Sequence, residues 1–213
     1  MVLQLAEPLD VPLRDRNQLL LAAGYAPTYG QRGLDDPDMD LVRETLELIL
    51  RGHEPYPAFV VDRHWGMIAA NRATSVLTEG AAPELLEPPA NVLRLALHPD
   101  GVAPRIVNLA QLRATLLRWL NRQAISTGDQ ALAALHEELS DLPCDDPSPR
   151  DQASGEIAVP LRIRWADAEL SFISTITTFA RAADITVAEL SVESFYPTDA
   201  RTGDILREFT AAP

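Results

Sequence analysis

The chain has 213 residues, of which 46% are hydrophobic and 23% charged, the composition of an ordinary globular protein. Its 31 acidic and 18 basic residues give a net charge of -13. Nucleic-acid affinity comes largely from Lys and Arg, so this charge argues against DNA binding by the chain alone. It argues equally against docking on an anionic membrane.

The sequence predicts a cytoplasmic protein. A single cysteine, Cys144, rules out an intrachain disulfide and fits a reducing compartment. The first residues lack the basic and apolar segments of a secretion signal, and no run of 18 uncharged apolar residues occurs.

The N-terminal 23 residues predict two short helices with apolar stripes, the second ending near Gly24. A polar linker over 25–35 follows. Asp36 and Pro37 are typical of a helix start, and apolar residues at helical spacing continue to Gly52.

Two strands are predicted next, over 58–62 and 65–70, joined by a tight turn at Arg63 and His64. Asn71 stands where the N-cap of a further helix is expected. A short amphipathic helix over 91–97 and two longer helices, one starting at Asn108 and one over 127–139, complete the middle of the chain. Asn108 and Gln111 have the spacing of a capping box.

The last third changes to a period of two. Strands are predicted over 157–165, 170–179 and 187–195, and a terminal helix over 202–209. Five strands with helices between the second and third predict an α+β fold, in which helices cover one face of the sheet and leave a cavity beneath.

Three blocks of sequence resemble the ligand-binding domain of MmyB-like transcription regulators. The first runs from HEPYPA (53–58) through VDRHW (61–65) to AAN (69–71), and the second contains NVLR (91–94), LHPDG (97–101) and IVN (106–108). The third contains TTF (177–179), Asp184 and ESF (193–195). The blocks span about residues 36–207 in the family's order.

This resemblance implies a PAS-like five-stranded antiparallel sheet over 35–213, with a cavity for an apolar, fatty-acid-like ligand. In that family the sensor follows an XRE-type helix-turn-helix domain. Residues 1–34 resemble the last two helices of such a domain with its linker, without the recognition helix. DNA contact is therefore expected only through the helix-turn-helix part of the full regulator.

Nine residues are candidates for ligand contact. Trp65 and Trp119 are aromatic groups suited to an apolar cavity, with ordinary core packing as the alternative. Arg94 and His98 are four residues apart on one helix face, where Arg94 would suit a carboxylate head group, unless it bonds an acidic residue or backbone carbonyls instead. The full set is Trp65, Asn71, Arg94, Leu97, His98, Leu116, Trp119, Phe172 and Ile176. Asn71 also suits a purely structural role as a cap or turn former.

No catalytic residue, metal ligand or cofactor is predicted. The four histidines lack metal-ligand spacing, and there is no phosphate loop or nucleophile elbow. Glu189 and Glu193, on one face of a predicted strand, would lie about 13 Å apart, too far for both carboxylates to act on one bond of a substrate.

Two alternative functions stay open: a ligand-free dimerisation module, favoured if no pocket exceeds about 300 Å³, and, ranked last, a hydrolase. The unburied stripes of residues 1–34 predict a homodimer.

Overall fold

The computed structural model describes residues 1–144 and 158–211. A five-stranded antiparallel sheet of order β2-β1-β5-β4-β3 forms its centre. The strands are β1 (Ala58–Val61), β2 (Met67–Ala70), β3 (Leu161–Trp165), β4 (Ala168–Thr178) and β5 (Ser191–Pro197). The predicted α+β, PAS-like class is confirmed.

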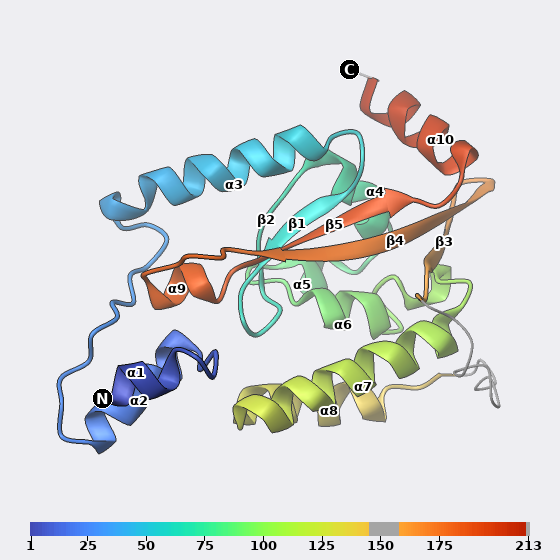
Figure 1. Cartoon of the computed structure of the whole chain (residues 1–213). Helices are drawn as coiled ribbons and strands as arrows, with labels where there is room; N and C mark the ends of the chain where they lie inside the picture. Colours follow the sequence, from blue (N-terminus) through green and yellow to red (C-terminus); the bar gives the residue numbers. More distant parts are fainter. Residues whose placement is uncertain (145–157, 212–213) are drawn as a thin grey trace.

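Helices lie on both faces of the sheet and beyond its end (Figure 1). The N-terminal helices are α1 (Val2–Ala6), α2 (Leu13–Ala22) and α3 (Asp40–His53), the last preceded by a 3-10 turn, η1 (Pro37–Met39). The others are α4 (Ser75–Thr78), α5 (Pro83–Leu86), α6 (Val92–Leu97), α7 (Leu109–Thr127), α8 (Gln130–Asp141), α9 (Ile185–Ala188) and α10 (Ala200–Ala211). Two further 3-10 turns are η2 (Arg72–Thr74) and η3 (Ala103–Arg105).

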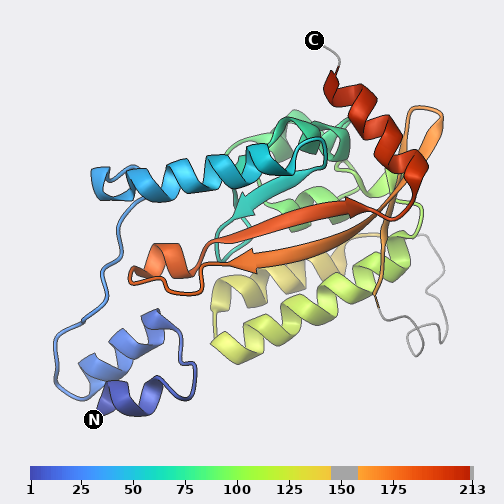
Figure 2. The ribbon, with the colours of Figure 1, turned by 45° about the horizontal axis from the view of Figure 1, so that its top comes forward.

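The two sheet faces bury separate apolar clusters, because side chains alternate along each strand. On one face, α3 places Leu46 and Leu50 against Val60 and Val192. On the other face, α6, α7 and α8 pack over the strands (Figure 2) and bury the larger cluster, which includes Phe172 and Leu120 with no exposed surface. This second face carries the cavity described below.

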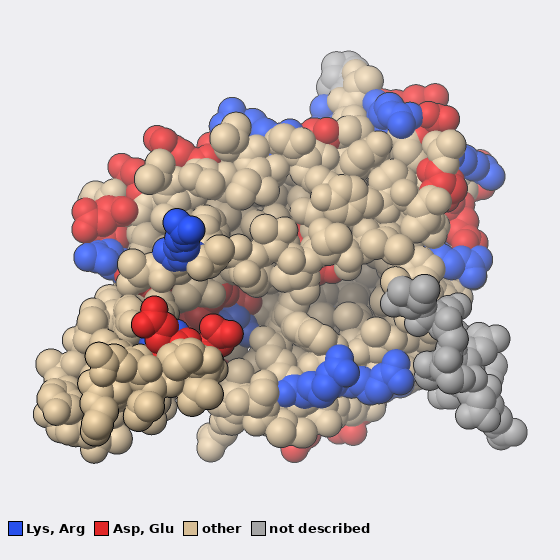
Figure 3. All heavy atoms as spheres, viewed as in Figure 1, with Lys and Arg blue, Asp and Glu red and all other residues tan. Residues whose placement is uncertain are grey.

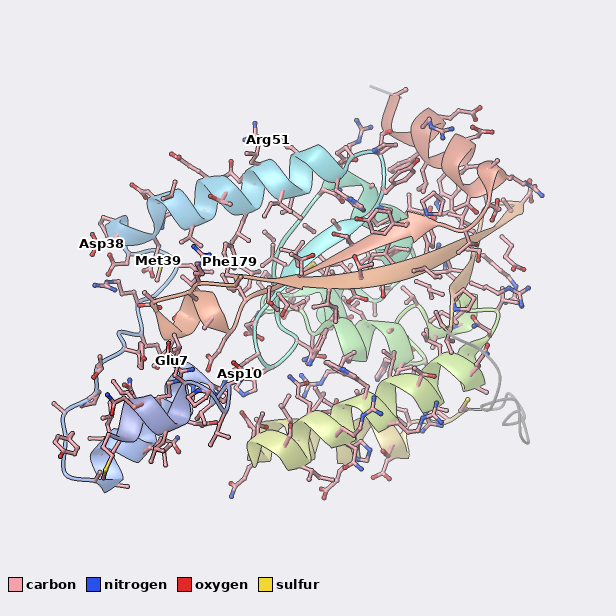
Figure 4. All side chains as sticks on the ribbon, in the orientation of Figure 1. Glu7, Asp10, Asp38, Met39, Arg51 and Phe179 are labelled. Atoms are coloured by element: carbon pink, nitrogen blue, oxygen red, sulfur yellow. The ribbon has the colours of Figure 1, made fainter. Side chains whose placement is uncertain are left out.

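The junction of α3 with the sheet lies at the start of that helix. Met39 and Phe179, the residue just after β4, border one shallow pocket there (Figure 4). Asp36 accepts a hydrogen bond from the Asp38 N–H, so the predicted helix start is seen, first as η1 and then as α3. Met39 is buried, which fixes this end of the helix on the sheet.

The predicted turn between the first two strands is built by one carboxylate. Asp62 accepts hydrogen bonds from the backbone N–H groups of His64 (2.8 Å) and Gly66 (2.9 Å). Trp65 lies inside this turn with a positive φ of 69°. The sequence predicted that Trp65 begins the second strand, but that strand begins at Met67. Its indole packs edge-on against Trp119, with 4.6 Å between ring centroids, which holds this unfavourable backbone conformation in place.

Three other local predictions differ from the structure. The strand predicted from Val187 begins at Ser191, because Asp184 accepts a hydrogen bond from the Thr186 N–H and caps the short helix α9. Asn108 precedes α7 as expected but makes no capping bond to it. Its amide oxygen instead accepts from the Arg162 N–H, and its NH₂ donates to the Pro160 carbonyl, which joins α7 to β3. The predicted strand from Ile157 begins at Leu161, and Ile157 itself lies outside the described residues.

Candidate ligand cavity

A cavity of about 130 Å³ lies between the sheet and the helices α4, α6 and α7. The side chains around it come from all five strands or their ends, from η2, α4, α6 and α7, and from the residues on either side of η3: Phe59, Met67, Thr74, Leu77, Thr78, Val92, Leu93, Leu95, Ala96, Val102, Ile106, Leu112, Leu116, Val159, Leu161, Ile163, Ser174, Glu193 and Phe195. Almost all of them are apolar. Small-molecule pockets begin at roughly 300 Å³, so this enclosed space is small.

The sheet floor of the cavity is set by strand register. Phe59 of β1 and Ile176 of β4 lie directly opposite Glu193 of β5, and Ser174 lies opposite Phe195. Opposite residues of an antiparallel ladder project from the same face. Glu193 therefore shares the cavity face with Phe195, whereas its neighbours Val192 and Ser194 project toward α3.

Glu193 is the one titratable group among the described residues that line the cavity. Burial raises the pKa of its carboxyl, and a hydrogen bond from the Ser174 hydroxyl offsets this only in part. No cationic side chain pairs with it among the described ion pairs. Burial without a paired cation disfavours the charged form of a carboxyl.

The cavity opens between the sheet and α7. Ser174 and Ile176 of β4 are exposed although they project from the covered face of the sheet. Figure 3 shows the surface hollowed between β4 and α7, with basic side chains along the α7 side. Arg118 and Arg122 are the exposed arginines of α7, and neither is in an ion pair within the part of the chain that is described.

Of the nine predicted contact residues, Leu116 lines this cavity. Leu97, Trp65, Trp119 and Phe172 belong to the surrounding apolar cluster, and core packing was the alternative that the sequence left open for the two tryptophans. The Trp65 indole N–H donates to the Gln123 side chain at 3.1 Å. These four residues support the cavity wall from behind, and their role as ligand contacts stays a prediction.

The polar candidates are occupied by structural bonds. Arg94 forms a two-point ion pair with Glu138 of α8, at 2.6 and 2.7 Å, which is the alternative that the sequence left open. His98 accepts a hydrogen bond from the Asp100 N–H through Nδ1. Asn71 is hydrogen-bonded to residues of α3, β1 and η2. The remaining candidate, the apolar Ile176, lies at the mouth of the cavity and is 48% exposed.

Sequence reasoning did not select Glu193 as a ligand contact, because it paired this residue with Glu189 on one strand. Glu189 instead ends α9 and forms a two-point ion pair with Arg14 of α2, at 2.6 and 2.8 Å. The sequence did contain an indication of this site. Glu193 and Phe195 are two residues apart on the predicted strand and so project from one face, whereas Val192 projects from the other.

Within residues 1–144 and 158–211, no group of three or more His, Cys, Asp or Glu side chains is placed to hold a metal ion. Over the same residues, no helix has the length and apolar character needed to cross a bilayer.

The fold and the cavity define a PAS-like ligand-binding domain. Residues 42–209 match the family model of the MmyB-like transcription regulator ligand binding domain, and the chain belongs to this family. A comparison with curated proteins gave no match.

Proposed function

We propose that this domain senses a small apolar, fatty-acid-like effector that binds in the cavity under α6 and α7 and changes DNA binding by the full regulator. The observation that carries the proposal is the apolar lining of a cavity that opens to solvent between β4 and α7. A ligand bound to one arrangement of the domain would shift the population toward it. The family supports a regulatory role, and no enzymatic step is part of the proposal.

The small enclosed volume shapes the expected pose. Because about 130 Å³ does not hold a long acyl chain, one end of the ligand would occupy the cavity and the rest would lie in the open groove. Extraction and native mass spectrometry of the purified protein, followed by melting curves with C6 to C18 fatty acids, test this. A retained lipid or a rise in melting temperature is expected. The absence of both would overturn the proposal.

The same volume favours a second candidate, a ligand-free interaction module, since it lies below the roughly 300 Å³ expected of a small-molecule site. Exposed leucines in α1, α2 and the turn between them supply a surface for self-association: Leu5, Leu9, Leu19 and Leu21. We expect a homodimer by sedimentation at micromolar concentration. A dimer with no effect of any acyl chain would select the module.

Residues 1–34 are proposed to be the end of a helix-turn-helix domain and its linker, with residues 35–213 forming the sensor. In support, α1 and α2 pack on each other, and α2 contacts the sensor at α9. Limited proteolysis should then cut first within the polar stretch 25–35. A cut inside 58–70 that precedes it would refute this division.

A further inference from the structure

The cavity contains a carboxyl group that no described side chain neutralises. Glu193 lies on β5, the central strand, and both backbone edges of β5 are paired with neighbouring strands. Its register with Phe59 places its half-buried side chain on the face of the sheet that carries the cavity, which it lines. The Ser174 hydroxyl is its hydrogen-bond partner within the described part of the chain.

Apart from Glu193, no charged or titratable side chain lines the cavity among the described residues. Phe59 of β1, Leu161 and Ile163 of β3, Leu93 of α6, and Leu112 and Leu116 of α7 line the same space, and none of them titrates. Charged groups do not contribute to the perturbation of its pKa, which burial alone raises. A buried charge without a partner is costly, so the neutral acid is the form that these surroundings favour.

We infer that Glu193 is a specificity-determining residue that, as a neutral acid, donates a hydrogen bond to an uncharged oxygen of the ligand. This inference rests on the proposed sensor function and narrows its ligand class. The class comprises medium-chain alcohols and acyl compounds that carry a hydroxyl or keto oxygen within hydrogen-bond reach of Glu193. A neutral donor and a neutral acceptor bond without burying a net charge, whereas an amine would require a desolvated ion pair, whose net gain is small.

The direction of the pH dependence follows. Below the pKa of Glu193 in the folded protein, the carboxyl has a proton to donate, and an alcohol binds. Above that pKa, the ionised group offers only acceptor oxygens and must be desolvated by the ligand. Affinity for a neutral alcohol therefore falls as pH rises through the raised pKa.

The test uses three eight-carbon probes: 1-octanol, octanoate and octylamine. Calorimetric titrations from pH 5 to 8.5 compare the wild-type chain with Glu193→Gln, Glu193→Leu and the control Glu44→Gln, which changes an exposed glutamate of α3. Glutamine keeps an N–H donor that does not titrate, and leucine removes the donor but keeps the apolar bulk. Circular dichroism confirms folding of each variant.

We expect 1-octanol to bind the wild-type chain about 5- to 10-fold more weakly at the top of the pH range than at the bottom, the value of about one hydrogen bond. Glu193→Gln should bind it without pH dependence, Glu193→Leu should lose about the same factor at low pH, and Glu44→Gln should match the wild type. Octylamine binding that rises with pH and disappears in Glu193→Gln would overturn the inference in favour of an ion pair. Equal octanoate and 1-octanol affinity in all variants would overturn it while leaving the sensor proposal standing. If no probe binds, both fail.

Discussion

Replacing Asn71 with alanine should destabilise the fold by about 3 kcal/mol, because its amide joins three separate elements. The side-chain oxygen accepts from the Ala58 N–H at 3.0 Å, and the NH₂ group donates to the Tyr56 carbonyl at 2.7 Å. The NH₂ group also donates a weaker bond to the Leu50 carbonyl at 3.3 Å, and the Thr74 hydroxyl lies 3.1 Å from the Asn71 side-chain oxygen.

The magnitude comes from the groups left without partners. Ala58 is fully buried, so its N–H would have no access to water after the substitution, and the Tyr56 carbonyl would lose its short bond. Each orphaned group costs roughly 1–3 kcal/mol. Thr74 adds little, because its single hydroxyl hydrogen keeps the closer acceptor, the Ala58 carbonyl at 2.9 Å, when the Asn71 oxygen is removed.

Urea denaturation followed by circular dichroism measures this change. The matched control is Asn121→Ala, which alters an exposed asparagine of α7 and should stay within about 0.5 kcal/mol of the wild type. If Asn71→Ala lowers the free energy of unfolding by less than about 1 kcal/mol, with an unchanged slope against urea concentration, then water replaces the amide and Asn71 does not hold these elements together.

Three further outcomes are expected. A double-mutant cycle on Arg94 and Glu138, both 44% exposed, should give a coupling of only about 0.5–1 kcal/mol, and less in high salt. Leu116→Trp should fill the cavity and remove any ligand-induced rise in melting temperature, whereas Ala114→Trp at an exposed position of the same helix should retain it. Because the folded-state pKa of Glu193 is raised, the wild-type free energy of unfolding should fall as pH rises from the unfolded pKa through the folded one. Glu193→Gln should lack this fall in equilibrium unfolding at pH 5 and pH 8, and an equal fall in both proteins would contradict the assignment.

Elements with strong local signals were predictable from the sequence. The alternation along β3 and β4 and the Asp36-Pro37 helix start are properties of short segments, and the structure places these elements close to their predicted positions. The sequence predicted the start of a strand inside α9 because Ile185, Thr186 and Val187 have high strand propensity. One cap bond from Asp184 overrides that propensity.

The site was less predictable, because its parts come from segments far apart in the chain. Arg94 is suited in sequence to a ligand carboxylate, but the packing of α6 against α8 supplies Glu138 first. The importance of Glu193 depends on its projecting from the face of β5 that carries the cavity, and that is fixed by the register with β1 and β4. Side-chain type alone does not contain this information.

The ion pair between Arg14 and Glu189 has a mechanical consequence. Glu189 and Glu193 are separated by three residues of one continuous backbone, at the entry to the central strand. In the proposed binding mode, a ligand at Glu193 would therefore bind only a few residues from the point where Arg14 connects α2 to the sensor. Any movement of α2 relative to the start of β5 would have to break this two-point ion pair or carry Glu189 with it.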